Sequence, residues 1–224
     1  MTRRLVITGA SGAIGEALAR HFSVQGDAVI ALSRGPSRYG TWHPCDLTDA
    51  AQIAALPDRI GTPVDALIHV AGIWEATAFT SDYSFLSRPS TETADILSVN
   101  LLAPILLTQA LFPALLQSPS GRVVLIGSTS GLENIGTPEV AYNASKAGLR
   151  AAAQALQKVS PRIGVTVINP GDLATYGTLA AQASGAMADD GTIPMADMVA
   201  TVAFALSLSP GSVLREMTLD PMRP

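Results

Sequence analysis

The sequence is poor in charge, has no surplus of basic residues and contains a single cysteine. Only 14% of its 224 residues are charged, and 18 acidic against 14 basic residues give a net charge of −4. We therefore expect neither a nucleic-acid partner nor a membrane-surface partner. Cys45 cannot form an internal disulfide, and a reducing, cytoplasmic compartment is expected. Arg3 and Arg4 precede an apolar run that soon reaches glycines, so no secretory signal is expected.

Metal-binding and membrane-spanning patterns are also missing. The three histidines, His21, His43 and His69, are scattered without the spacing of metal ligands, so no metal site is predicted. The most apolar segment, 101–116, is interrupted by two prolines and a glutamine. It is too short for a membrane span, and a buried helix explains it better.

What the sequence does contain is an alternation of apolar strands and helical segments. A length of 224 residues, 48% of them hydrophobic, suits one domain whose central strands are covered on both faces. Seven strand-like runs are separated by about six helical segments. This alternation predicts an α/β fold: a Rossmann-like, doubly wound parallel sheet with helices on both faces, in a single domain over residues 1–224. The runs lie within residues 5–7, 28–32, 43–49, 63–72, 122–131, 164–171 and 213–219.

The first strand ends in a glycine-rich turn and is followed by a helical pattern. Strand, turn and helix are the context that gives a G-x-x-G-x-x-G pattern a meaning. Gly9 permits the tight turn, Gly12 lets the backbone approach a pyrophosphate, and Gly15 lets the helix pack on the strand. The helix N-terminus would then face the phosphates, with Ser11 and Ile14 among the contacts. A purely structural turn is the alternative.

The residues after the second strand bear on the choice of cofactor. In a dinucleotide-binding fold this point meets the adenosine ribose, where a site that prefers NAD places an acid. This chain has Ser33 and Arg34 there, with Arg38 slightly later. Guanidinium groups suit a 2′-phosphate by charge and geometry, which favours NADP(H) over NAD(H). The alternative is that both arginines are ordinary loop charges.

The third strand leads into Asp46, Leu47, Thr48 and Asp49. Asp46 could accept a hydrogen bond from an adenine amine, with Leu47 beside it at the cofactor. Asp49 or Thr48 could cap the helix that follows, and capping is the competing role for either acid.

Two further positions lie near the centre of the expected sheet. Ala71 and Gly72 end the fourth strand, and their small size leaves room for a flat cofactor. His69, just before them, is expected to be a hydrogen-bonded core histidine. Asn100 lies within an apolar run and should have a partner. It is equally consistent with a structural hydrogen-bonding role and with a link in a proton path.

Tyr142 and Lys146 lie four positions apart in an alanine-rich helical segment, so their side chains share one face. The lysine charge is expected to lower the pKa of the tyrosine, which would then exchange a proton with an alcohol or carbonyl oxygen. Ser128 belongs to the hydroxyl-rich end of the fifth strand, where ligands bind in open α/β sheets. The alternative is a half-buried aromatic residue beside a solvated lysine.

Three longer segments complete the sequence-based interpretation. Residues 73–88 are polar, aromatic and irregular, and we expect a loop near the mouth of the site that helps to select the substrate. Residues 91–117 should be mostly helical, with a bend at Pro104. Residues 172–194 are rich in Ala, Gly and Thr, which suits a mobile lid.

These motifs occur together in one order, and the set resembles the short-chain dehydrogenase/reductase family in its single-domain form. The resemblance covers nearly the whole chain, from about residue 5 to the last strand. It rests on Thr8-Gly9…Gly15, Ala71-Gly72, Asn100, Ser128, Tyr142…Lys146 and Pro170-Gly171…Thr175.

The resemblance implies an NADP(H)-dependent oxidoreductase that interconverts a carbonyl and a secondary alcohol by hydride transfer. Tyr142 would be the general acid/base, and Lys146 would lower its pKa and hold the nicotinamide ribose. Ser128 would orient the substrate carbonyl, and Asn100 would support a water that leads protons to the lysine. Thr175 would contact the nicotinamide carboxamide, while Pro170 and Gly171 would line the cofactor and Asp46 would contact adenine. A homodimer or homotetramer is expected.

The chain also departs from the family pattern. The middle glycine of the turn lies one place early, a spacing found in the longer epimerase-like branch, and His69-Val70 replaces the usual Asn-Asn. The segment from Ser128 to Tyr142 is one residue longer, so Thr129 is an alternative carbonyl donor, although Gly131 favours Ser128. The C-terminal end lacks the usual Asp-Gly-Gly. A non-catalytic NADP-binding sensor or scaffold is therefore the second hypothesis, and nucleotide-sugar epimerase or dehydratase chemistry is a third.

Overall fold

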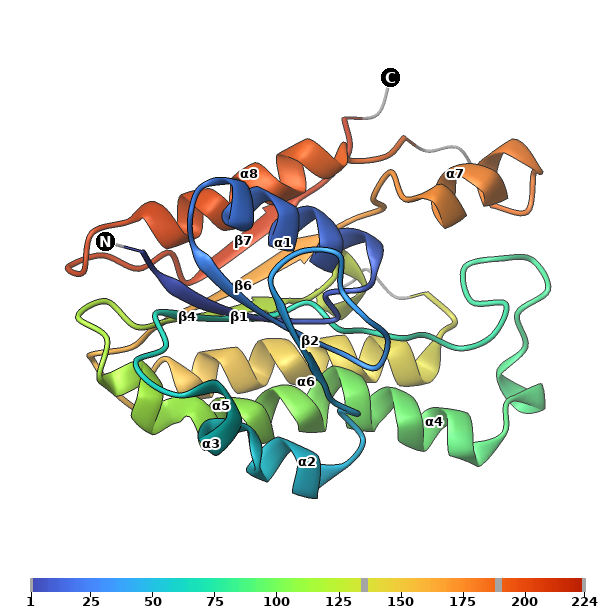
Figure 1. Cartoon of the computed structure of the whole chain (residues 1–224). Coiled ribbons are helices and arrows are strands. Elements are labelled where there is room, and N and C mark those ends of the chain that lie inside the picture. The colour runs from blue at the N-terminus through green and yellow to red at the C-terminus, as the bar shows by residue number, and fades with distance from the viewer. Residues whose placement is uncertain (1, 134–136, 188–190, 223–224) are drawn as a thin grey trace.

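The computed structural model describes residues 2–133, 137–187 and 191–222. Within them, seven strands form one parallel sheet in the order β3-β2-β1-β4-β5-β6-β7, which confirms the predicted single-domain α/β fold (Figure 1). The order reverses between β1 and β4, which are neighbours in the sheet. The strands are β1 (Arg4–Thr8), β2 (Ala28–Ser33), β3 (Thr41–Pro44), β4 (Ala66–His69), β5 (Arg122–Ile126), β6 (Gly164–Pro170) and β7 (Glu216–Leu219).

The central strands are apolar because both of their faces are covered. Every residue of β4 and of β5 is buried. In Figure 1, helices α1 (Ala13–Val24) and α8 (Met195–Ser207) cover one face of the sheet, and the other face carries α5 (Ala103–Leu116) and α6 (Val140–Leu156). The described helices also include α2 (Ala50–Ala54), α3 (Leu56–Ile60), α4 (Ser90–Leu97) and α7 (Tyr176–Ala183).

Each face has its own hydrophobic core. On one side, Leu18 and Phe22 of α1 pack with Met198 of α8. On the other, Leu107 of α5 packs with Leu149 of α6 in a larger cluster. This two-sided burial is what fixes the sheet as a rigid support for the loops at its edge.

The prediction that a helix lies between every two consecutive strands is wrong at one place. The connection between β2 and β3, residues 34–40, contains bends but no helix. Gly35, Pro36 and Gly40 disfavour a helix there, and seven residues are too few for a helical crossover. The third strand also ends at Pro44, earlier than predicted.

The segment 90–116 is one helical stretch in three parts. A π-helical turn (Ser98–Leu102) joins α4 to α5, directly before Pro104. By length and composition the 27-residue stretch could cross a membrane, with a mean hydropathy of 1.8 in its most apolar window, so the predicted helical extent of 91–117 is confirmed to within one residue but the helix is not too short for a span. Leu107, Leu111 and Leu115 are nevertheless fully buried against the sheet, as predicted for a core helix.

Parallel pairing brings the carboxyl ends of all strands to one edge of the sheet. The segments that follow β4, β5 and β6 all leave from this edge (Figure 1). The expected lid, residues 172–194, contains α7, and a bridge between Leu173 and Ile193 closes its base. Residues 188–190 of that segment lie outside the described part of the chain.

Candidate active site

Tyr142 and Lys146 lie on one face of α6, as their spacing predicts. The Nζ atom of Lys146 is 5.6 Å from the centroid of the Tyr142 ring. Lys146 is only 5% exposed, and its ammonium donates a hydrogen bond of 2.9 Å to the carbonyl oxygen of Ile126, the last residue of β5. The helix face with the two functional side chains therefore packs on the carboxyl end of the neighbouring strand.

Ser128 follows β5 and reaches the phenol. A hydrogen bond from its hydroxyl lowers the pKa of Tyr142. Its oxygen also accepts a hydrogen bond of 3.1 Å from the Ser130 amide, which fixes the side chain. Gly131 packs against the backbone of Lys146, where an added Cβ would lie 2.7 Å from the carbonyl carbon. These contacts favour Ser128 over Thr129 as the group beside Tyr142.

The pKa of Tyr142 differs from the sequence-based prediction. Burial raises it, the Ser128 hydrogen bond opposes that rise, and the charges of Asp172 and Glu75 raise it further. Lys146 is not among the groups that shift it, and burial lowers the pKa of Lys146 itself to about 8. The tyrosine pKa is thus raised in this structure and not lowered as the spacing predicts, because desolvation and two carboxylates outweigh the Ser128 hydrogen bond.

Asn100 lies in the π-helical turn with its amide fully engaged. Its Oδ1 accepts from the Ile73 amide at 2.8 Å, and its Nδ2 donates to the Ile73 carbonyl at 2.7 Å and to Ser145 Oγ at 3.0 Å. An added Cβ on Gly72 would lie 3.6 Å from Asn100 Oδ1 and 3.5 Å from Lys146 Nζ. Asn100 therefore anchors the end of β4 beside the lysine, and its part in a proton path stays a prediction.

The glycine-rich turn has the geometry of a phosphate cradle. Gly9 has a φ of +64°, and an added Cβ would lie 2.8 Å from Cα of Ala71. An added Cβ on Gly15 would clash with the carbonyl oxygen of Gly9. Gly12 is the N-cap of α1, and Ser11 and Gly12 are exposed, so the first amides of the helix face an open turn. Ile14 packs against the core of its own face of the sheet.

Hydrogen bonds hold the end of β4 in place, although His69 and Val70 replace the two asparagines that are usual in the family. Thr8 Oγ1 accepts hydrogen bonds from the amides of Val70, at 3.0 Å, and Ala71, at 3.1 Å. His69 is a core histidine, as predicted. It makes a hydrogen bond of 3.2 Å to Thr108, and burial lowers its pKa to about 3.

The residues expected at the adenosine end lie at the carboxyl ends of β2 and β3. The Ser33 hydroxyl donates to the Gly35 carbonyl at 2.8 Å. Arg34 is exposed and makes no hydrogen bond or ion pair among the described residues, whereas Arg38 is 3.4 Å from Glu16. Asp46 accepts hydrogen bonds from the amide and the hydroxyl of Thr48, which lower its pKa.

Asp49, not Thr48, caps the helix after the third strand. Its Oδ1 accepts from the amides of Ala51 and Gln52 at the start of α2. Leu47 packs against the core next to this cap. The capping alternative is thus confirmed for Asp49, and the predicted adenine contacts of Asp46 and Leu47 stay predictions.

The last predicted cofactor residues follow β6. Pro170 ends this strand opposite Leu219, and the Gly171 amide donates to the Leu219 carbonyl at 2.8 Å. Thr175 is the N-cap of α7, and its Oγ1 accepts from the Thr178 amide at 3.1 Å. These contacts place Thr175 at a helix start on the same sheet edge as Tyr142.

Three residues near Tyr142 were not singled out from the sequence. Trp74 and Phe79, from the loop after β4, make edge contacts with the Tyr142 ring, at centroid distances of 6.5 Å and 5.3 Å. Glu75 accepts hydrogen bonds from the backbone amides of Ala141 and Tyr142. Glu75 stands out in the sequence as an acid between a tryptophan and an alanine. Its hydrogen-bond partners Ala141 and Tyr142 lie far along the chain.

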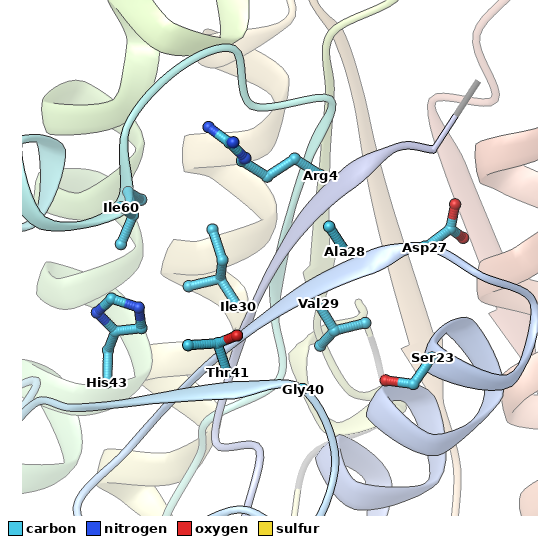
Figure 2. Close-up of a pocket in the computed structure, with 10 residues that line it drawn as sticks. All are labelled: Arg4, Ser23, Asp27, Ala28, Val29, Ile30, Gly40, Thr41, His43 and Ile60. Atoms are coloured by element: carbon cyan, nitrogen blue, oxygen red, sulfur yellow. The ribbon is translucent and has the colours of Figure 1, made fainter.

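A separate cavity of about 450 Å³ lies away from this site (Figure 2). Arg4 and Ala28, which begin β1 and β2, line it together with Thr41, the first residue of β3. It is thus at the amino ends of the strands, whereas Tyr142, Ser128 and the glycine turn lie at the carboxyl ends.

Comparison with known proteins agrees with this geometry. Residues 3–184 match the model of the short chain dehydrogenase family. The chain belongs to this family. A ketoacyl reductase of Nostoc is 30% identical over 194 residues, which cover 78% of this chain and 65% of that reductase, so the chain spans less than two thirds of it.

Solved structures of short-chain dehydrogenases have the same fold. An alcohol dehydrogenase of Thermococcus sibiricus, in complex with 5-hydroxy-NADP, has a TM-score of 0.83, covers 100% of this chain and 99% of its own, and is 22% identical. A short-chain dehydrogenase of Shigella flexneri in complex with NADP has a TM-score of 0.80 and 26% identity, with 97% of this chain and 96% of that chain covered.

The residues of this family member fit a dinucleotide. The positions of Gly9 and Gly15 leave no room for a side chain, which keeps the turn before α1 tight and its amides accessible. Gly9, Ser11, Gly12 and Gly15 would hold the phosphates, and Ala71 and Gly72 border the space in front of Lys146.

Proposed function

We propose that the protein is an NADP(H)-dependent reductase of a small-molecule carbonyl compound. The observation that carries this proposal is the convergence of Ser128, Tyr142 and Lys146 at the carboxyl edge of the sheet, beside the glycine turn. Ser128 bonds the phenol, and the lysine ammonium lies 5.6 Å from its ring centroid. A proton donor, a hydrogen-bonding hydroxyl and a positive charge form the set that carbonyl reduction requires.

The protonation state of Tyr142 supports the reductive direction. Burial and two carboxylates raise the pKa of its phenol, so the group is protonated at neutral pH. A dinucleotide held by Gly9, Ser11, Gly12 and Gly15 would supply the hydride chemistry when bound. Ser128 orients the carbonyl oxygen, and Tyr142 donates its proton to that oxygen as negative charge develops, while the Lys146 ammonium lies 5.6 Å from the Tyr142 ring centroid. The name of the Nostoc relative, a ketoacyl reductase, agrees with this direction.

The preference for NADP(H) rests on Arg34. Its guanidinium is exposed and without a hydrogen-bond or ion-pair partner among the described residues, at the end of β2. A free guanidinium can bind a 2′-phosphate bidentately. The structure of the Shigella flexneri dehydrogenase with NADP supports the same choice.

The test is a turnover screen. The protein is titrated with NADPH to measure affinity, and NADPH oxidation is then followed with aldehydes, ketones and 3-oxoacyl thioesters. We expect tight binding and turnover with at least one class. Tight binding without turnover on every class would instead establish the NADP-binding sensor or scaffold. The hydrogen bonds of Thr8 weigh against that reading, because they keep the β4 end in place despite His69-Val70.

A further inference from the structure

The loop after β4 and the start of the catalytic helix exchange hydrogen bonds through two glutamates. Glu75 Oε1, from the loop, accepts from the amides of Ala141 at 2.8 Å and Tyr142 at 3.2 Å. In return, Glu139 Oε1 accepts from the Phe79 amide of the loop at 2.6 Å. Glu139 is the N-cap residue of α6 but makes no capping bond with its own side chain, so Glu75 takes over that role.

Both carboxylates are buried, which is costly. Glu75 is 2% exposed and Glu139 is 1% exposed. In each, Oε2 is buried and has no hydrogen-bond partner among the described residues. Burying a carboxylate costs free energy unless hydrogen bonds compensate it, and a carboxylate at a helix N-terminus also has the favourable end of the helix dipole.

The loop backbone is held in a strained conformation between these contacts. Thr77 has a φ of +61° and Phe79 a φ of +64°, in the left-handed region that non-glycine residues seldom adopt. Such residues persist where surrounding contacts over-determine them, and they cluster at functional sites. The bond from Phe79 to Glu139 is one such contact.

The strained segment presents two aromatic rings to the reactive phenol. Phe79 meets Tyr142 edge-on at 85° and Trp74 meets it at 86°, while Trp74 and Phe79 lie 6.4 Å apart at 60°. Trp74 is nevertheless 58% exposed. A large apolar surface beside a proton donor is therefore open to a ligand.

We propose that Glu75 and Glu139 form a reciprocal clasp that holds residues 74–79 against the N-terminus of α6, so that Trp74 and Phe79 form an aromatic wall beside Tyr142 that favours a carbonyl substrate with a flat apolar substituent. The substrate part of this proposal rests on the proposed function, whereas the clasp itself does not. Glu75 is a positioning residue in this arrangement, and Trp74 determines specificity.

The clasp is tested without turnover, through the aromatic wall itself. Trp42→Phe leaves Trp74 as the last tryptophan, and its near-UV circular dichroism reports whether the ring is held fixed. We expect Glu75→Ala and Glu139→Ala each to remove most of the Trp74 signal, and the double variant to do no more, because either change opens the same clasp. Glu75→Gln keeps an acceptor oxygen and should retain the signal. An intact signal in Glu75→Ala, or additive losses, would overturn the clasp.

The charge of Glu75 provides a second measurement, the pH dependence of kcat. A purely structural role of Glu75 would leave this pH dependence unchanged. Tyr142 faces Lys146 on its own helix and the carboxylates of Glu75 and Asp172 from other segments. Glu75→Gln removes one carboxylate that raises the phenol pKa, so the basic limb of the kcat profile for reduction should move to lower pH. Glu92→Gln is the matched control, because Glu92 bonds the Ala76 amide of the same loop but not α6. An equal shift in both variants, or none in Glu75→Gln, would contradict the positioning role.

The aromatic wall is tested with two ketones. Trp74→Ala should raise the KM for acetophenone about tenfold while the KM for butan-2-one changes by less than about twofold, since only the aryl group contacts the indole. Equal changes for both ketones would overturn the specificity role. If the unaltered protein turns over no carbonyl compound, the proposed function is overturned, and the substrate part of this proposal is overturned with it. The circular dichroism of Trp74 still tests the clasp in that case.

Discussion

Lys146 holds a charge where the protein interior disfavours one. The residue is 5% exposed, and burial lowers the pKa of its amine to about 8 from the usual 10.5. Its hydrogen-bond partner is the neutral carbonyl of Ile126. A buried cation without a paired carboxylate reduces stability, and such a site is typical of a functional group.

This burial predicts a pH-dependent stability. Below pH 8 the folded protein bears the full free-energy penalty of burying the charged lysine. Between about pH 8 and 10.5 the unfolded chain binds more protons than the folded protein, so the free energy of unfolding rises with pH in this range. Lys146→Met in the cofactor-free protein should therefore be more stable by roughly 1–3 kcal/mol at pH 7, with a smaller difference at pH 10. Thermal unfolding at both pH values measures this. Exposed Lys158→Met is the control, and an equal gain there would refute the explanation.

We propose that Arg34 carries the preference for NADP(H). Arg34→Asp should weaken NADPH binding by about 10- to 100-fold, the loss of a charge-assisted hydrogen-bonding group, and NADH binding far less. Binding titrations with both nucleotides provide the comparison. Arg20→Asp makes the same charge change on an exposed part of α1 and should leave both affinities nearly unchanged. Equal weakening of NADPH and NADH by Arg34→Asp would make Arg34 a bystander.

Residue positions could be predicted where local spacing or strand ends determine them. The shared face of Tyr142 and Lys146 follows from helix periodicity, and the approach of Ser128 follows from the common edge of parallel strands. Glu75 could not be assigned in this way, because its partners Ala141 and Tyr142 are 66 and 67 positions away. The raised pKa of Tyr142 also depends on this distant carboxylate.

At the scale of elements, the turn between β1 and α1 is closely constrained by its neighbours. An added Cβ on Gly15 would clash with the Gly9 carbonyl, and Gly9 itself lies against Ala71. Close packing of helix on strand is thus linked directly to the position of the phosphate-binding amides.

Gly15→Ala should therefore displace the turn. We expect a loss of about 1–3 kcal/mol in unfolding free energy from overpacking and a weakening of NADPH binding of at least about tenfold. Gly211→Ala is the control, since an added Cβ there lies 4.0 Å from its nearest neighbour, Ser209 Oγ. Chemical denaturation and NADPH titration test both variants, and unchanged NADPH affinity in Gly15→Ala would contradict the cradle.

The elements themselves were predictable to different degrees. The buried strand of residues 122–126 follows from its continuous apolar run, and the helix of residues 195–207 follows from its length and apolar content. The π-helical turn at Ser98–Leu102 was not predictable, because the apolar pattern continues through it and Asn100 is fixed only by Ile73 and Ser145 from elsewhere. The helix-free connection of residues 34–40 was signalled by its glycines and proline.

At the scale of the whole molecule, the long helix from α4 to α5 buries one side in the core and leaves apolar residues on the other. Leu102 is 49% exposed and Ile105, one turn further, is 37% exposed. Neighbouring apolar residues on an exposed helix face favour association with another surface.

We expect this face to join copies of the chain into a homodimer or homotetramer. Sedimentation should give a mass of two or four times 23.1 kDa. Leu102→Glu with Ile105→Glu should shift the protein toward the monomer, because like charges would be buried at the contact. Val24→Glu is the control, because Val24 is an exposed apolar residue on a different helix, α1. A monomeric unaltered protein would contradict this expectation.

The central claim is that the Tyr142 phenol supplies the proton for carbonyl reduction, and Tyr142→Phe tests it most directly. The change removes one oxygen and leaves the ring contacts with Phe79 and Trp74 in place. With a carbonyl substrate found in the turnover screen, kcat should fall by about 100-fold or more, the contribution of general acid catalysis, while the NADPH affinity changes little. Full turnover by Tyr142→Phe would contradict the account.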